Sequence, residues 1–343
     1  MSDIDIRITG HAGHITLRRP KALNALTYAQ IPQISAALCK WADDDRVALV
    51  IIDAEGDKAF CAGGDIADLY AAGCKGDYSF GQRFWRDEYR LNAQIAEYAK
   101  PIASFLQGFT MGGGVGIGCH ASSRVVGDTS RIAMPECGIG LVPDVGGSLL
   151  LAMAPGRLGE YLGLTAARME AGDAIHAGFA DHYLPEDTWP ALIEELETTG
   201  DISAIPRAAQ PAPPSKMQEQ HDIYERFFDE KSLADIAAKL DQSDSDFATA
   251  TLKALSRNSP LSMACGLDLI RQVRNTPTIR AALTLEYRFT ARATEHGDFI
   301  EGIRAAIIDK TREPHWKHDL TSVTEQDIEQ MMAPLGDLEL TWE

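Results

Sequence analysis

The stretch PIASFLQGFTMGGGVGIG, residues 101–118, changes character half-way along its length. Its first half is a run of apolar and small residues with the length of a buried strand. Its second half is rich in glycine, which permits tight turns, and it leads into residues that can start a helix. A strand that passes through glycines into a helix is the building block of α/β proteins, so this stretch predicts an α/β fold.

The sequence on either side of this stretch supports the same fold class. Buried strands are predicted at residues 46–54 (RVALVIIDA) and 123–128 (SRVVGD), and residues 3–8 with 14–19 (DIDIRI, HITLRR) predict an opening β-hairpin. From Ile31 the apolar residues recur with the spacing of one helical face. Strands that alternate with helices in this way favour a parallel or mixed sheet.

The composition of the chain changes at residues 199–216. This segment, TGDISAIPRAAQPAPPSK, is rich in proline, alanine and small polar residues and is predicted to be an exposed linker. Residues 1–198 before it are predicted to form the α/β catalytic core. Residues 217–343 after it show helical patterning with almost no strand signal and are predicted to form a helical C-terminal region.

The charge and the cysteines limit the partners and the compartment. The 343-residue chain has 50 acidic and 32 basic side chains and a net charge of −18, which argues against nucleic acid or an anionic membrane as its partner. Its six cysteines form no CxxC pair and no metal-ligand spacing, which is typical of reduced thiols. The start of the chain lacks the pattern of a targeting leader, and no apolar run reaches the length of a membrane span. A cytoplasmic protein is therefore expected.

Several standard sites are excluded by inspection. The sequence contains no GxxxxGK[ST] phosphate loop, no GxSxG nucleophile elbow and no HExxH or paired Cys/His metal motif. The glycine run at residues 112–118 misses the GxGxxG fingerprint of dinucleotide binding, because Ile117 stands at the position of the last glycine. Neither a metal nor a redox cofactor is expected.

Two glycine-rich segments are candidates for the reaction centre. Residues 57–66 (DKAFCAGGDI) and 107–118 each follow a predicted strand and put glycine where a helix could begin. Two backbone N–H groups that face one point can stabilise negative charge developing on an oxygen atom. Either segment alone is better explained by glycines that allow tight turns and close packing. Asp65, at the start of a predicted helix, is expected to be its N-cap.

A third segment, MPECGIGLVPDVGG at residues 134–147, places two acids among apolar residues, glycines and prolines. Glu136 and Asp144 would be poorly solvated there, and such charges usually persist when they are paired or used in chemistry. Glu136 could instead be an ion-paired or helix-capping carboxylate, and Asp144 could simply cap a helix.

In order and separation, these motifs resemble the crotonase (enoyl-CoA hydratase/isomerase) superfamily. The resemblance covers nearly the whole chain and rests on RRPKALNAL, AFCAGGDI, GFTMGGGVG, MPECGIGLVPDVGG and EGIRAAIIDKTREPHW. It implies a crotonase-like spiral of ββα units. It also implies that the amides of Gly64 and Gly113 polarise a thioester carbonyl, that Ala62 contacts the adenine end of coenzyme A, and that Lys21 and Lys310 approach its phosphates. Alternatively, Lys21 and Lys310 are solvated surface residues that do not contact the ligand.

The subfamily is suggested by a departure from the hydratase pattern. Hydratases of the superfamily carry one glutamate at the position of Gly116 and a second at that of Glu136, so concerted hydration lacks one acid here. Asp144 within PDVGG resembles the 3-hydroxyisobutyryl-CoA hydrolases of valine degradation. This implies hydrolysis of a short 3-hydroxyacyl-CoA, in which Glu136 attacks the carbonyl or activates water. Asp144 would then hold the 3-hydroxyl or assist proton transfer.

Two other functions remain open at this point. One is an enoyl-CoA hydratase or isomerase that works through Glu136 alone, and the other is a catalytically silent acyl-CoA-binding protein. A homo-oligomer is a further expectation from the resemblance.

Arg86 and Glu88 in FWRDEYRLN could line the acyl pocket, although a surface ion pair explains them more simply. Cys61 and Cys137 lie inside the motifs and are expected to be packing residues.

Overall fold

The computed structural model describes residues 2–342, which form two compact units. The first unit contains the chain up to Asp65 together with Asp87–Ala133 and Arg168–Glu219. The second contains Ile66–Arg86, Met134–Ala167 and the chain from Gln220 onward. The predicted division at 199–216 stays a prediction, and that segment contains a short helix, α9 (Ala204–Ala208).

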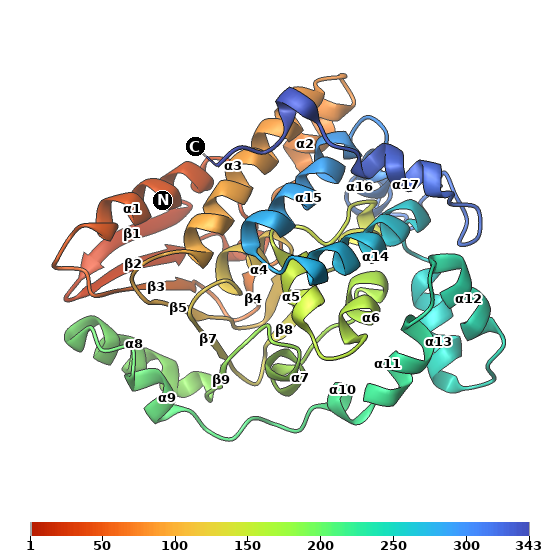
Figure 1. Cartoon of the computed structure of the whole chain (residues 1–343). Coiled ribbons are helices and arrows are strands. Elements are labelled where there is room, and N and C mark those ends of the chain that lie inside the picture. The colour runs from red at the N-terminus through yellow and green to blue at the C-terminus, as the bar shows by residue number, and fades with distance from the viewer. Residues whose placement is uncertain (1, 343) are drawn as a thin grey trace. The chain divides into compact units, whose positions relative to one another are not determined.

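The first unit holds two sheets (Figure 1). The larger has the order β1-β2-β3-β5-β7-β9, in which only β1 and β2 pair antiparallel. The smaller is parallel and has the order β4-β6-β8. The strands are β1 (Ile4–Thr9), β2 (Ala12–Leu17), β3 (Leu49–Ala54), β4 (Ala59–Cys61), β5 (Ile102–Phe105), β6 (Phe109–Met111), β7 (Ser123–Val126), β8 (Arg131–Ala133) and β9 (His182–Tyr183).

Successive strands alternate between the two sheets, which is the spiral that the family resemblance implies. The pairs β3–β4, β5–β6 and β7–β8 each place their first strand in the larger sheet and their second in the smaller one. The corner between β5 and β6 requires a glycine: Gly108 has a φ of +56°, and a Cβ there would lie 2.1 Å from the carbonyl oxygen of Lys58. The predicted opening hairpin and the three predicted buried strands are confirmed.

Helices cover the larger sheet of the first unit. Trp189, Leu192 and Leu196 of α8 pack with β3, β5 and β7 in one buried cluster. The buried run Leu49–Ile52 of β3 is apolar throughout, as expected for a strand covered on both faces. The helical segments of this unit are η1 (Pro20–Ala22), α1 (Gln30–Ala42), α4 (Gly113–Gly118), α7 (Ala171–His176), η3 (Glu186–Thr188), α8 (Trp189–Thr199), α9 and α10 (Lys216–Glu219).

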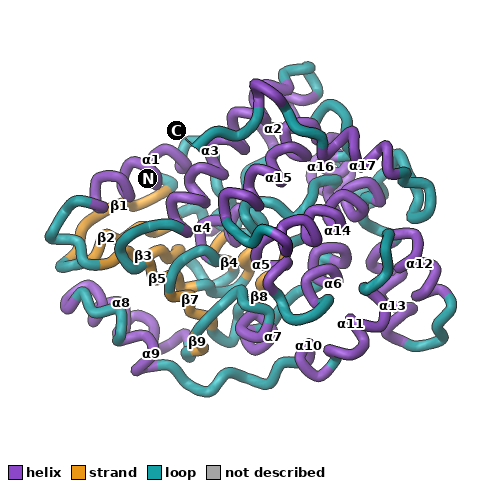
Figure 2. The backbone as a smooth tube through the Cα atoms, viewed as in Figure 1, coloured by secondary structure: helices purple, strands orange, loops and turns teal. Residues whose placement is uncertain are grey.

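The second unit is helical, and none of the strands of the described chain belongs to it (Figure 2). Within it α14 packs against α5 and α6, and α15 against α14 and α17. Its elements are α2 (Ala67–Gly73), η2 (Glu136–Ile139), α5 (Gly147–Met153), α6 (Leu158–Thr165), α11 (His221–Phe228), α12 (Leu233–Asp241), α13 (Asp246–Leu255), α14 (Pro260–Asn275), α15 (Ile279–Ala293), α16 (Phe299–Ile303), η4 (Arg304–Ile308), α17 (Glu325–Met332) and η5 (Gly336–Leu338). The predicted helical C-terminal region is thus confirmed. α3 (Tyr78–Ala96) runs through both units.

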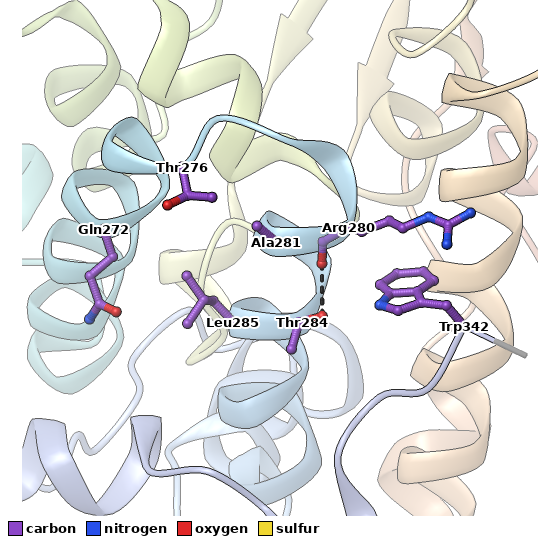
Figure 3. Close-up of a pocket in the computed structure, with 7 residues that line it drawn as sticks. All are labelled: Gln272, Thr276, Arg280, Ala281, Thr284, Leu285 and Trp342. Carbon is purple, nitrogen blue, oxygen red and sulfur yellow. Dashed lines mark hydrogen bonds between the residues drawn. The ribbon is translucent and has the colours of Figure 1, made fainter.

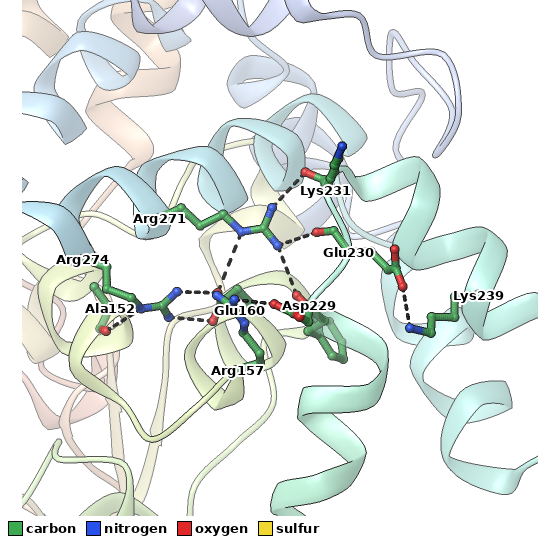
Figure 4. A network of polar contacts seen from close by, with 10 residues as sticks. Ala152, Arg157, Glu160, Asp229, Glu230, Lys231, Lys239, Arg271 and Arg274 are labelled. Carbon is green, nitrogen blue, oxygen red and sulfur yellow. Dashed lines mark hydrogen bonds and ion pairs between the residues drawn. The ribbon is translucent and has the colours of Figure 1, made fainter.

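A buried carboxylate ties three helices of the second unit together (Figure 4). Glu160 of α6 is fully buried and accepts two hydrogen bonds from the guanidinium of Arg274 in α14, at 2.8 and 2.9 Å. Arg157 also donates to Glu160 at 3.0 Å and pairs with Asp229, which follows α11. Arg271 lies 3.9 Å from Glu160 and donates to the backbone carbonyls of Phe228, the last residue of α11, and Glu230. Removing the one carboxylate would leave three cations without their common partner.

None of the helices in residues 2–342 is both long enough and apolar enough to cross a membrane.

Candidate active site

Gly64 and Gly113 come together within the first unit. Gly64 follows β4, and Gly113 is the first residue of α4 after β6. A Cβ built on Gly113 would lie 3.3 Å from the amide nitrogen of Gly64. The loop around Gly64 is pinned on both sides by Leu26, whose N–H donates to Gly63 at 2.9 Å and whose carbonyl accepts from Asp65 at 2.8 Å. The two glycines are therefore close neighbours, and the role of their amides as an oxyanion hole stays a prediction.

The three residues predicted to bind coenzyme A differ in their exposure to solvent. Ala62 is half-buried, and its N–H donates to the carbonyl of Leu23 at 3.0 Å. Lys21 in η1 of the first unit is exposed. Lys310 of the second unit is exposed and has a φ of +56°. Exposure leaves both ammonium groups available to an anionic ligand, and their role stays a prediction.

Asp65 is not the helix N-cap that the sequence suggested. The helix that follows it has Ile66 at its N-cap without a side-chain hydrogen bond. The Asp65 carboxylate accepts from the guanidinium of Arg19 at 3.0 Å instead. A partner 46 positions earlier in the chain took the place of a local cap, which short-range patterns cannot anticipate.

Glu136 and Asp144 are both buried in the second unit, each with 4% of its surface exposed. Glu136 is the first residue of η2, whose backbone is fixed by a hydrogen bond from Ser259 N–H to the carbonyl of Cys137 at 2.8 Å. Asp144 precedes two residues in left-handed conformation, Val145 at φ +54° and Gly146 at φ +79°. Gly146, two residues after Asp144, stands at the N-cap of the helix that follows.

The hydrogen-bond donors at the start of α5 are bound by the carboxylate of Glu286, a residue that the sequence analysis did not identify as a candidate. Its carboxylate accepts from Gly146 N–H at 2.8 Å, from Ser148 N–H at 3.1 Å and from the Ser148 hydroxyl. Burial, with a contribution from the nearby charge of Asp144, raises the pKa of Glu286 to about 8. Glu286 thereby fixes the turn that carries Asp144, including the left-handed Val145.

The arrangement can be compared with known proteins. The model of the enoyl-CoA hydratase/isomerase family matches residues 12–332, nearly the whole chain. This chain belongs to that family. The 3-hydroxyisobutyryl-CoA hydrolase, mitochondrial, of Rattus norvegicus is 39% identical, with 96% of this chain and 89% of that protein covered. The Homo sapiens protein of the same name is 37% identical over 96% of this chain and 88% of its own length.

Solved structures of the family superpose closely. An enoyl-CoA hydratase from Rhodobacter sphaeroides 2.4.1 is 55% identical, with a TM-score of 0.95 and coverage of 99% of this chain and 100% of that one. A carnitinyl-CoA dehydratase from Mycobacterium thermoresistibile is 39% identical, also with a TM-score of 0.95, and covers 100% of this chain and 99% of its own. The predicted crotonase-like fold is therefore confirmed.

Arg86 and Glu88 of the FWRDEYRLN segment belong to different units and have different surroundings. Glu88 is only 3% exposed, so its interpretation as a surface residue is wrong. A Cβ on Gly113 would lie 2.9 Å from the Glu88 carboxylate, which places Glu88 beside the glycine pair of the first unit. Arg86 belongs to the second unit, where its guanidinium donates to the Tyr287 hydroxyl at 3.0 Å.

The cysteines inside the family motifs are packing residues, as predicted. Burial raises the pKa of the Cys61 thiol to about 12 and that of Cys137 well above its usual value. Thiols of this kind are not nucleophiles at neutral pH. Among residues 2–342 there is also no group of three or more His, Cys, Asp or Glu side chains arranged to hold a metal ion.

A separate surface cavity of about 410 Å³ lies in the second unit (Figure 3). The Arg280 guanidinium stands over the indole of Trp342 at 5.5 Å from the ring centroid. The remaining lining residues are Gln272, Thr276, Ala281, Thr284 and Leu285. None of the predicted site residues lines this cavity.

Proposed function

We propose that this protein hydrolyses 3-hydroxyisobutyryl-CoA to 3-hydroxyisobutyrate and coenzyme A, a step of valine degradation. The observation that carries the proposal is the buried acid pair Glu136 and Asp144 in a chain that has Gly116 where hydratases carry their other glutamate. The relatives named as 3-hydroxyisobutyryl-CoA hydrolases, at 36–39% identity over nearly the whole chain, support the same activity.

The glycine pair would act on the thioester carbonyl. When the carbonyl carbon is attacked, its oxygen gains negative charge, and the N–H groups of Gly64 and Gly113 would stabilise that charge by hydrogen bonds. The backbone around Ala62 and the side chains of Lys21 and Lys310 would bind the coenzyme A portion of the substrate.

Glu136 would supply or activate the nucleophile. In one route its carboxylate attacks the carbonyl carbon, the C–S bond breaks, and water then cleaves the resulting anhydride. In the other it removes a proton from water as the water oxygen bonds to the carbon, and the C–S bond breaks afterwards. In both routes the departing thiolate takes up a proton, and Asp144 would assist that transfer or hold the 3-hydroxyl. Neither route calls for a metal or redox cofactor.

The decisive test is release of the free coenzyme A thiol from 3-hydroxyisobutyryl-, 3-hydroxypropionyl-, acetyl- and crotonyl-CoA. Rapid release confined to the 3-hydroxyacyl thioesters is expected, with large losses of turnover in Glu136→Gln and Asp144→Asn. Thiol release that Glu136→Gln leaves unchanged in a folded protein would contradict the assignment of Glu136.

Hydration is the second candidate function, because the Rhodobacter sphaeroides structure at 55% identity is named an enoyl-CoA hydratase. Loss of the conjugated absorbance of crotonyl-CoA without thiol release would establish it. Binding of the thioesters without either reaction would instead identify a silent acyl-CoA-binding protein.

The compartment and the assembly state remain predictions. The curated relatives are named as mitochondrial proteins, whereas the sequence led us to expect a cytoplasmic one. The homo-oligomer is likewise an expectation, which sedimentation of the purified protein would test.

A further inference from the structure

The turn that carries Glu136 is enclosed by the starts of two helices of the second unit. Glu136 is the first residue of η2, Ser259 is the N-cap of α14, and Asp298 is the N-cap of α16. Ser259 is fully buried and Asp298 is only 2% exposed. These two polar side chains are far from Glu136 in the sequence, and their contacts with the turn come from packing.

Ser259 binds the turn from the side of α14. Its N–H donates to the carbonyl of Cys137, the residue after Glu136, at 2.8 Å. Its hydroxyl oxygen accepts from Ser262 N–H at 3.2 Å, so that the same residue caps the first turn of α14. The carbonyl next to Glu136 is therefore fixed to the start of a helix of 16 residues.

The opposite end of the turn packs against α16 through two glycines. Gly140 is the left-handed C-cap of η2, and a Cβ on it would lie 2.5 Å from the carbonyl group of Asp298. A Cβ on Gly302 would lie 2.2 Å from the carbonyl oxygen of Ile139. Backbones this close leave no room for η2 to shift toward α16.

A hydrogen bond between side chains joins these two supports. The Ser259 hydroxyl donates to Asp298 Oδ2 at 2.6 Å, and Asp298 Oδ1 accepts from Lys317 N–H at 3.3 Å. The Asp298 carboxylate makes no capping bond to its own helix. The contacts form a closed ring, from Cys137 to Ser259, to Asp298, to Gly140 and back along η2. A hydrogen bond to a buried carboxylate is strong, so it resists opening of this ring.

We propose that Ser259 and Asp298 are positioning residues for Glu136, which act through the backbone of η2. The assignment rests on the proposed function, in which Glu136 attacks the thioester carbonyl or activates water. Either step needs close alignment of the reacting atoms, and a misplacement of about 1 Å can lower the rate about 10²-fold. The turn of Asp144 has a separate support in Glu286, so the two acids are positioned independently.

The test measures kcat and KM for thiol release from 3-hydroxyisobutyryl-CoA, well below the unfolding temperature of each variant. Ser259→Ala and Asp298→Ala should each lower kcat by about 10- to 100-fold. KM should change little, because binding of the thioester does not depend on the alignment of Glu136. The double variant should lose no more than either single one, since the first substitution already opens the ring. Multiplied losses in the double variant would contradict the proposal.

A second cycle separates positioning from a general loss of structure. In a Glu136→Gln protein, adding Ser259→Ala should not lower the residual rate further, because there is no longer a carboxylate to align. A further fall of the same factor would overturn the positioning role.

The matched control is Ser215→Ala. The Ser215 hydroxyl donates to Asp173 at 2.7 Å, and both residues are buried in the first unit. This variant should lose stability and keep kcat. Loss of kcat in Ser215→Ala as large as that in Ser259→Ala would show that any broken buried hydrogen bond has the effect.

The conservative variant Asp298→Asn keeps an oxygen that accepts from Ser259, in a weaker, uncharged bond. It should retain much more turnover than Asp298→Ala. If the alanine variants do not fold, Asp298→Asn decides: a lowered kcat at unchanged KM supports the role, and an unchanged kcat overturns it. Absence of thiol release by the unmodified protein would refute the proposed function and this role with it.

Discussion

Substituting Gly113 by alanine should inactivate the protein without unfolding it. Gly113 has no positive φ and is the first residue of α4, so its backbone accepts a side chain, and alanine is favoured over glycine in a helix by up to about 1 kcal/mol. The added methyl would lie 2.9 Å from Glu88 Oε1 and 3.3 Å from Gly64 N. The first contact is with the end of a flexible side chain, which can move aside.

The second contact decides the effect on catalysis. A methyl carbon 3.3 Å from the Gly64 nitrogen would crowd the space next to that nitrogen, where we expect the thioester oxygen to accept a hydrogen bond at about 2.9 Å. One donor is therefore blocked. Loss of one oxyanion-hole donor typically lowers kcat by about 10² to 10³, equivalent to about 2.7 to 4 kcal/mol of transition-state stabilisation. Gly113→Pro also removes the Gly113 N–H and should lower kcat at least as far.

The assay is thiol release at saturating 3-hydroxyisobutyryl-CoA, run beside thermal unfolding. Gly114→Ala is the matched control in the same helix, because its methyl would lie 2.1 Å from the carbonyl oxygen of Cys61, a backbone atom that cannot move aside. Gly114→Ala should lose stability, whereas Gly113→Ala should keep stability and lose turnover. A folded Gly113→Ala protein with unchanged kcat would refute the oxyanion assignment of this pair.

Three other measurements test the electrostatics and the packing. The pKa of Glu286 rises from 4.5 to about 8 on folding, so the buried acid keeps its proton between these values while the unfolded chain releases it. Its contribution to stability is full below pH 4.5 and is lost as the pH rises to about 8, by at most about 1.4 kcal/mol per pH unit. Urea unfolding from pH 5 to 8.5 should show this decline in the unmodified protein and not in Glu286→Gln. Glu160→Gln should cost about 3 kcal/mol in the same assay, since its three arginines lose their buried partner, whereas Glu195→Gln, which removes an exposed ion pair with Arg207, should change nothing measurable; equal effects would disprove the network. Iodoacetamide should modify only Cys39 and Cys74 in the native protein, and this modification should not lower its activity. In urea the reagent should modify all six cysteines. Modification of a buried thiol in the native protein would contradict the packing role of that cysteine.

Patterns within a few residues of one another predicted most of the fold. The hairpin, the buried strands and the helical C-terminal region follow from the period of the apolar residues. The prediction that Gly64 and Gly113 lie close together is correct. It came from the family resemblance, which relates segments that are far apart in the sequence. Asp65 was misjudged since its partner Arg19 is not a sequence neighbour.

The sequence did not predict the positions of buried acids whose hydrogen-bond partners come from distant segments of the chain. Glu286 lies among the buried positions of α15, such as Ile279, Leu283 and Tyr287, and this helical spacing was the signal that it is buried. Its partners at Gly146 and Ser148 are about 140 residues away, so no local pattern could identify them. A glutamate on an apolar helix face is a hint of such a long-range contact.

The sequence alone identified the family, the α/β spiral and the glycine and acid motifs, because these depend on local periodicity and on short ordered segments. Only the tertiary structure placed the Glu88 carboxylate beside Gly113, gave the Asp144 turn its support from Glu286, and replaced the expected cap at Asp65 by an ion pair. The physical reason is that burial and hydrogen bonding of a charged side chain are set by whichever distant segments pack around it.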